Sequence, residues 1–298
     1  YITFAINVHD WRNVDESADT LLRLIGLFEK YGVRGDFYLT GPMTEYYVQQ
    51  RPDLVSRLRQ RSMTISYHVR PPHPLYTNFD ERLRGLNDEE VKQLLAAYEL
   101  YRLDLATGDL DRSQPGGYQL VANTFGRLPV CAPSPNDDMR IKRISQQVYY
   151  ELGARMTLMY HESGTKIETP FEYVQGLLVR PSDFSITRWQ KLGGPDTELF
   201  WWNMLDTEFA EEFNPARYLQ QRLAAWNAAR PPYITVLIHE NNFYRQGGTP
   251  WDFVYFSDTK KSTVLQPPYD LTAPDASQPR SVERSEERRV GKECRSRW

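Results

Sequence analysis

The sequence has little cysteine, little excess charge and no long apolar run, and each of these absences excludes a class of protein. Only 2 of the 298 residues are cysteine, which excludes a fold held together by disulfides and a metal site built from CxxC pairs. The 36 basic and 39 acidic residues leave a net charge of −3, so we expect no nucleic-acid partner, because such proteins carry a basic surface. No stretch of ~18 apolar residues occurs, so we expect no transmembrane segment. The hydrophobic share of 40% and the charged share of 25% are typical of a globular protein with a buried core.

The two ends of the sequence differ from its body. Tyr1 lies inside a predicted strand, and we expect the natural N-terminus to be missing. Beyond residue 279 the chain is charged and has no apolar periodicity, and its last residues, RSEERRVGKECRSRW, resemble translated vector sequence. We therefore predict one domain over residues 1–265 and a disordered tail over 266–298, of which 280–298 is foreign to the protein.

Segments with strand and helix patterns alternate along the body. Runs rich in β-branched and apolar residues predict strands at 1–8, 35–41, 63–67, 128–132, 155–160, 176–180 and 233–238. Apolar residues at helical spacing predict helices between them. One covers 15–32, a second begins at a capping box formed by Asn87 and Glu90 and ends at Gly108, and a third begins at Asn214 and Pro215. Residues 109–126 are predicted as loop. Mostly apolar strands alternating with helices predict an α/β fold with a buried parallel sheet, and about seven such units favour a distorted or incomplete (β/α)7-type barrel.

The five histidines of the chain are placed unevenly. His9, His68, His161 and His239 each follow a predicted strand, and His73 lies in the same loop as His68. In a βα barrel the loops after the strands form the active-site face. We therefore expect all five histidines at one end of the barrel.

Asp10 stands next to His9 and completes a candidate metal site with His68 and His73. Two imidazoles and one carboxylate form a donor set for a divalent metal, zinc first, and three protein ligands leave one coordination position for water. The prolines between the two histidines of the loop stiffen that segment.

These residues resemble the motifs of the polysaccharide deacetylases of the NodB homology type, the family 4 carbohydrate esterases. Residues 8–11 (VHDW) stand where the first motif of that family has a strand ending in two acidic residues. Residues 37–41 (FYLTG) are similar to its ATFFLxG passage. His68 and His73 with the following proline resemble its second motif, and residues 236–239 (VLIH) resemble its last motif.

The chain departs from the pattern of that family in four places. His9 stands where the family has the carboxylate of its catalytic base. His68 and His73 are one residue further apart than in the usual HxxxH motif. Residues 131–133 (CAP) replace the arginine–proline motif after the fourth strand, and Asp183 is the nearest counterpart of the Asp-Trp motif.

The resemblance implies a metal-dependent hydrolase that removes acetyl groups from a glycan or a related small acetylated substrate. The metal held by Asp10, His68 and His73 lowers the pKa of its bound water toward ~7, and His239 protonates the leaving amine. His9 has three alternative roles: it accepts the proton of the water, it orients Asp10 by a hydrogen bond, or it replaces Asp10 as a ligand while Asp10 acts as the base.

The second hypothesis is a non-catalytic module that keeps the fold and binds a glycan or a protein. Trp11 and Tyr118 are candidate walls for a sugar ring, although aromatic side chains more often pack in a core. The placement of Asp10, His68 and His73 separates the two hypotheses, because the metal-dependent enzyme requires these three side chains to meet at ligand distance.

Overall fold

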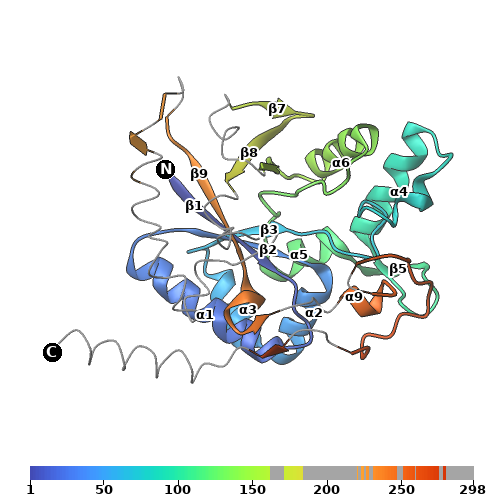
Figure 1. Cartoon of the computed structure of the whole chain (residues 1–298), viewed down its shortest axis with the longest axis horizontal. Helices are drawn as coiled ribbons and strands as arrows, with labels where there is room; N and C mark the ends of the chain where they lie inside the picture. Colours follow the sequence, from blue (N-terminus) through green and yellow to red (C-terminus); the bar gives the residue numbers. More distant parts are fainter. Residues whose placement is uncertain are drawn as a thin grey trace.

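The computed structural model describes residues 1–161, 171–183, 231–246, 251–258 and 260–274, together with five positions between 220 and 227 and residues 278–279. Its centre is a four-stranded parallel sheet with the order β3-β2-β1-β9 (Figure 1). The strands are β1 (Ile2–Val8), β2 (Gly35–Leu39), β3 (Thr64–Tyr67) and β9 (Ile234–His239). Because all four run in the same direction, their carboxyl ends meet at one edge of the sheet.

A second sheet continues the first one. In it β6 (Met156–His161) pairs in parallel with β8 (Leu177–Asp183), and β7 (Tyr173–Val174) pairs antiparallel with β8. Residues 130–131 connect the two sheets, because Val130 N donates to Ile65 O of β3 at 2.9 Å and Met156 N of β6 donates to Val130 O at 3.0 Å. The predicted α/β fold with a parallel sheet is therefore confirmed.

The predicted closure into a barrel is not seen in the described residues. Between β8 and β9 the connection is made by side chains: Arg180 Nε donates to Thr235 Oγ1 at 3.2 Å, and no backbone pairing joins the two strands. The strand predicted at 128–132 is reduced to a single bridge between Cys131 and Met156. Pro129 and Pro133 flank this bridge, and a proline has no backbone N–H to donate to a neighbouring strand. A single bridge is compatible with the two prolines, whereas a longer strand is not.

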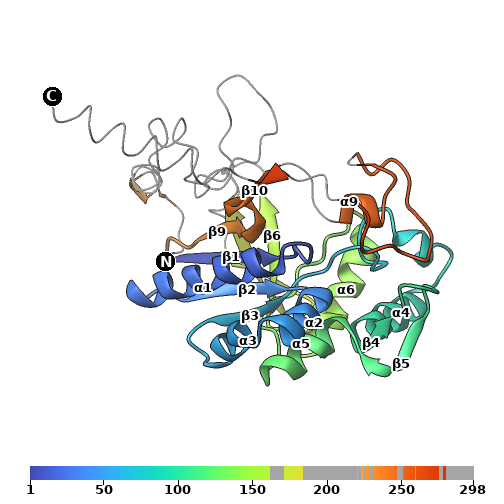
Figure 2. The same ribbon diagram turned by 90° about the horizontal axis from the view of Figure 1, so that it is seen from below.

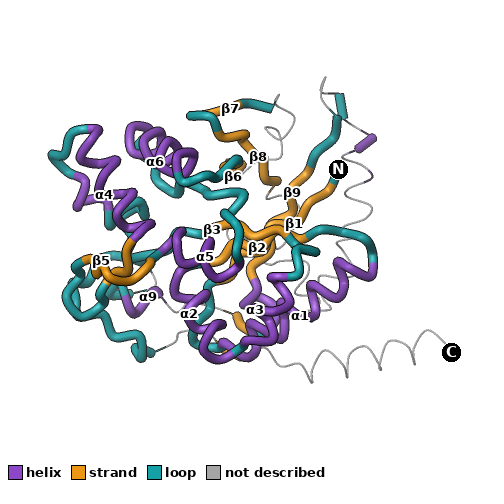
Figure 3. Tube along the Cα trace, turned by 180° about the vertical axis from the view of Figure 1, so that it is seen from behind, coloured by secondary structure: helices purple, strands orange, loops and turns teal. Residues whose placement is uncertain are grey.

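Helices cover one face of the four-stranded sheet, as Figures 1 and 3 show for α1 (Val14–Lys30), α2 (Gly41–Gln50), α3 (Pro52–Arg59) and α5 (Gly117–Phe125). The apolar stripe of α1 that the sequence predicts is buried, including Leu21, Ile25 and Phe28. Gly35 allows α1 to approach β2, because a Cβ atom at this position would lie 2.4 Å from the ring of Phe28. α1 begins after Asn13 rather than at the predicted Asp15.

The remaining elements lie mostly at the end of the molecule away from Tyr1 (Figure 2). They include α4 (Asp88–Leu100), α6 (Met139–Glu151), the β4–β5 hairpin (Tyr101–Leu103 and Leu110–Pro115) and α9 (Trp251–Val254). The short elements η1 (Asp80–Leu83), η4 (Glu240–Phe243), β10 (Arg245–Gln246) and β11 (Gln278–Pro279) complete the described chain. In the described part, no helix has the length and the apolar character needed to cross a membrane.

Three sequence-based predictions of local structure need correction. The capping box of Asn87 and Glu90 is present, but α4 ends at Leu100 because the chain turns there into β4. Residues 109–126, predicted as loop, form β5 and α5. Part of the predicted tail is ordered, since Tyr269 is buried and its backbone N donates to Leu105 O at 2.9 Å. The predicted helix after residue 214 lies largely outside the described residues, and 280–298 lies outside them entirely.

Candidate functional site

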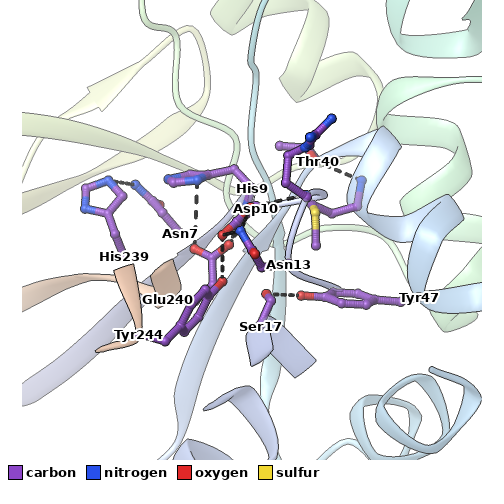
Figure 4. A network of polar contacts seen from close by, with 12 residues as sticks. Asn7, His9, Asp10, Asn13, Ser17, Thr40, Tyr47, His239, Glu240 and Tyr244 are labelled. Atoms are coloured by element: carbon purple, nitrogen blue, oxygen red, sulfur yellow. Dashed lines mark hydrogen bonds and ion pairs between the residues drawn. The ribbon is translucent and has the colours of Figure 1, made fainter. Parts of the chain in front are cut away.

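Polar side chains gather where β1, β3 and β9 end. His9 and Asp10 directly follow β1, His68 follows β3, and His239 is the last residue of β9. All of them except His239 are fully buried. Figure 4 shows the part of this cluster around His9 and the carboxyl group of Glu240. The prediction that these histidines meet at one edge of the sheet is therefore confirmed for His9, His68 and His239.

The three imidazoles of the cluster are neighbours. The ring centroid of His9 lies 5.2 Å from that of His239 and 6.1 Å from that of His68. Neither ring nitrogen of His9 or of His68 has a hydrogen-bond partner within the described residues. His239 differs, because its Nε2 lies 3.1 Å from the amide nitrogen of Asn7. A buried polar atom without a partner carries a free-energy cost, so the rings of His9 and His68 need an explanation beyond packing.

Burial and nearby cations keep His9 and His68 neutral. The pKa of His9 lies well below its usual value, first because the ring is removed from water and then because Arg70, His239 and His68 disfavour a further positive charge. The pKa of His68 is lowered in the same way by burial, Arg70 and His239. Near pH 7 both imidazoles therefore keep a lone pair that can accept a proton.

Glu240 is a functional candidate that the sequence analysis missed. Its carboxyl group is completely buried beneath His9, where Oε1 accepts hydrogen bonds from the backbone N–H groups of His9 at 2.7 Å and Asp10 at 2.8 Å (Figure 4). Oε2 lies 3.9 Å from His9 Nδ1. Burial, with a further contribution from the Asp10 charge, raises the pKa of Glu240 to about 8. The chain thus places a carboxyl group beside His9. This group follows the last strand, β9, whereas the resemblance placed the carboxylate of the base in the first motif. The signal in the sequence was the position of Glu240 directly after His239, the histidine that ends the last strand.

A pocket of about 290 Å³ opens beside His9 and His68. This is close to the lower end of the range of ~300–1,000 Å³ that is usual for ligand sites. Trp11, Arg70 and His73 also line it, together with a group of tyrosines, namely Tyr46, Tyr67, Tyr98, Tyr101 and Tyr255. His239 is absent from the pocket wall in the described residues.

Asp10 is engaged by donors of the protein. Its Oδ1 accepts from the backbone N of Arg12 at 3.2 Å, and its Oδ2 accepts from the hydroxyl of Tyr244 at 3.0 Å. The amide of Asn13 donates to both oxygens, at 3.2 and 3.0 Å. The carboxylate is therefore held by the start of α1 and by the segment that follows η4.

His73 is engaged in a different set of contacts. Its Nδ1 accepts from the backbone N of Leu75 at 3.0 Å, and its Nε2 lies 3.1 Å from the carboxylate of Glu99. Glu99 is buried and also accepts from the backbone N of Tyr118 at 3.1 Å and from the hydroxyl of Tyr149 at 2.5 Å. Both ring nitrogens of His73 thus face groups of the protein.

The predicted metal ligands do not form a donor group in this arrangement. No cluster of three or more His, Cys, Asp or Glu side chains suited to a metal ion occurs among the residues that the structure describes. The reason lies in the contacts: the oxygens of Asp10 face Asn13 and Tyr244, and the nitrogens of His73 face Leu75 and Glu99. Asp10, His68 and His73 as placed here therefore do not fit a zinc site.

The other predicted residues are placed as follows. Trp11 lines the pocket and packs against the rings of Trp251 and Tyr255, as a wall residue should. Tyr118 lies in the core instead, where its hydroxyl donates to Pro129 O at 3.1 Å, and this position does not fit contact with a sugar ring. The side chains of His161 and Asp183 lie outside the described residues.

Comparisons with known proteins add little to this geometry. No family model and no curated protein matches the chain. Four chains of solved structures match it. One of them is the crystal structure of the 4-alpha-glucanotransferase from Thermococcus litoralis, with 12% identity and a TM-score of 0.45, covering 80% of this chain and 34% of that one. This chain thus spans about a third of that structure, and a similarity of this size describes neither its fold nor its activity.

Proposed function

We propose that the pocket binds a carbohydrate or a related small acetylated molecule and that His9 and His68 catalyse hydrolysis of its acetyl group. The observation that carries this proposal is the pair of buried, neutral imidazoles on the pocket wall, whose ring nitrogens have no partner in the described residues. Leaving such a group unpaired costs ~1–3 kcal/mol, and a role in proton transfer is one of the few reasons to retain it.

The chemistry assigns each group a task. His9 accepts a proton from the water that attacks the acetyl carbon, and it returns the proton to the leaving nitrogen or oxygen. Oε2 of Glu240 lies 3.9 Å from His9 Nδ1, so the ionised form of Glu240, which is populated as the pH approaches 8, offsets the charge of the imidazolium formed in the first step. A neutral His68 donates its N–H to the oxyanion that develops on the acetyl oxygen.

This assignment differs from the roles expected from the sequence in two respects. The sequence-based prediction gave protonation of the leaving group to His239, whose ring lies 5.2 Å from that of His9 and does not line the described part of the pocket wall. It also gave activation of the water to a metal, whereas Asp10 and His73 face other groups of the protein. The proposed steps therefore use side chains alone. Of the three roles expected for His9, the proposal retains that of the base.

A non-catalytic, carbohydrate-binding role is the second candidate. It is favoured by the failure of Asp10, His68 and His73 to meet, because that convergence was the requirement of the metal-dependent enzyme. The aromatic wall formed by Trp11 and the pocket tyrosines suits a sugar ring equally well in an enzyme and in a binding module.

Acetate release from acetylated amino-sugar oligomers and O-acetylated sugars separates these candidates. For the full chain we expect release that persists in a chelator and is lost in His9→Ala. Saturable sugar binding without any acetate release would establish the binding role instead. Release that requires stoichiometric zinc, with the zinc lost in Asp10→Ala, would overturn the metal-free proposal and restore the ligand set expected from the sequence.

We also propose that the two sheets belong to an incomplete (β/α)7-type barrel. Two contacts support this architecture: the bridge through residues 130–131 on one side, and the hydrogen bond from Arg180 to Thr235 on the other. An experimental structure that covers residues 184–230 tests whether further strands complete the ring.

A further inference from the structure

Arg70 is a charged pocket residue that the proposed hydrolysis does not use. It lies two residues after His68 and lines the same pocket. The carbon at the centre of its guanidinium group lies 4.7 Å from the ring centroid of Trp251, so a cation–π contact holds it against α9. Its charge reaches the histidines, because it contributes to the lowered pKa of both His9 and His68.

Arg70 has no anionic partner among the residues that the structure describes. None of the ion pairs between described residues includes it, and its buried Nε has no hydrogen-bond partner there. The other charges of the pocket neutralise one another, since the guanidinium of Arg102 lies 3.2 Å from the carboxylate of Glu45. With His9 and His68 neutral, Arg70 gives the described lining of the pocket an uncompensated positive charge.

The geometry points to a substrate with an anionic group, and the binding unit that fits best is an acidic sugar bearing a carboxylate. A guanidinium group presents parallel N–H donors that match a carboxylate or a phosphate, and it is the usual partner for such groups in partly buried sites. The stack on Trp251 removes rotamers of Arg70 before binding, which lowers the entropic cost of contact. This inference rests on the proposed function, because it assigns a substrate class to the same pocket.

Binding of matched sugars tests the inference without requiring turnover. Methyl glucuronide and methyl glucoside have the same ring and differ in the carboxylate, and glucose 6-phosphate presents a phosphate instead. At low ionic strength we expect the full chain to bind the glucuronide about tenfold or more tightly than the glucoside. This preference should shrink as salt is added, because salt screens exposed charges.

Three variants assign the preference to a residue. Arg70→Gln should abolish the discrimination between glucuronide and glucoside. Arg143→Gln removes an exposed cation outside the pocket, and its partner Asp88 stays paired with Arg140, so this variant should leave the discrimination intact. Because Arg70→Gln also removes the stack on Trp251, Arg70→Lys provides a second test: it keeps the charge and should retain part of the preference.

Each outcome bears on the inference. Equal binding of the acidic and neutral sugars, no binding of either anionic sugar, or a preference that survives in Arg70→Gln would overturn it. Tighter binding of glucose 6-phosphate than of the glucuronide would replace the carboxylate by a phosphate ester as the recognised group. A clear preference for the glucuronide without acetate release from any acetylated sugar would leave this inference standing while the proposed hydrolysis fails.

Discussion

Replacing Glu240 with glutamine tests the electrostatics at the base of the site. The carboxyl group is completely buried, its pKa is raised to about 8, and its Oε1 accepts two backbone N–H groups. Glutamine keeps an oxygen for those two donors but cannot ionise. The substitution therefore removes the titration of this residue while retaining its contacts with His9 and Asp10.

The sign of the effect follows from the direction of the pKa shift. A carboxyl group whose folded-state pKa is raised above the unfolded value of 4.5 stabilises the fold fully below that value, and the stabilisation is lost as the pH rises toward about 8. A shift of this size lowers the free energy of unfolding by about 3 kcal/mol between pH 5 and pH 8. His9 and His68 act in the opposite direction, since their lowered pKa values destabilise the fold as the pH falls below about 6.5.

Urea unfolding of the two proteins at pH 5, 6, 7 and 8 isolates the contribution of Glu240, because the histidine contributions cancel in the difference. We expect Glu240→Gln to gain stability relative to the wild type by about 3 kcal/mol over this range. Glu151→Gln is the control: the hydrogen bond from Lys92 lowers the pKa of Glu151, so that group stays ionised across the range and its removal should leave the slope unchanged. Parallel pH dependences for the wild type and Glu240→Gln would refute the reasoning, because they would mean that Glu240 is ionised throughout.

Three further predictions concern residues away from the reacting groups. Tyr118→Phe removes the hydrogen bond to Pro129 O, so it should cost about 1 kcal/mol in urea unfolding and leave sugar affinity unchanged; a large loss of affinity would return Tyr118 to the binding site. Burial raises the pKa of the Cys131 thiol to about 12, so in a Cys294→Ser background iodoacetamide should label the chain at pH 8 only after unfolding, and labelling of the native protein would contradict the buried position. Deletion of residues 280–298 should leave the melting temperature unchanged, and a clear decrease would show that this segment belongs to the fold.

The sequence predicted the first half of the fold well because its signals there are local. Strand β1 and helix α1 each combine a complete apolar pattern with a clear end, and the capping box at Asn87 is visible from two residues. Helix α5 was missed because it is short and begins at a pair of glycines, Gly116 and Gly117, which are typical of loops. The contact between β8 and β9 is made by side chains far apart in the sequence, Arg180 and Thr235, and no local pattern specifies it.

The candidate site could be predicted as a group of residues but not in its orientations. That His9, His68 and His239 lie together follows from their positions after parallel strands. The direction of the Asp10 carboxylate depends on Asn13 and on Tyr244, which is distant in the sequence. The spacing pattern predicts a metal ligand at Asp10 but could not predict the protein donors that contact its carboxylate.

The pairing of His73 with Glu99 shows the same limit of spacing arguments. The two residues belong to the loop after β3 and to helix α4, and the sequence between them contains no motif that links them. Arg70 was likewise passed over, because an arginine in a proline-rich loop is usually solvated. Its significance depends on Trp251 and on the absence of an ion-pair partner in the described residues.

The most direct test of the account is the rate of acetate release by His9→Gln on the best substrate of the wild type, with sugar affinity measured on the same samples. If His9 accepts the proton of the attacking water, the rate should fall by ~10²-fold or more while the affinity stays within a few-fold of the wild type. A variant that releases acetate at the wild-type rate would contradict the central claim.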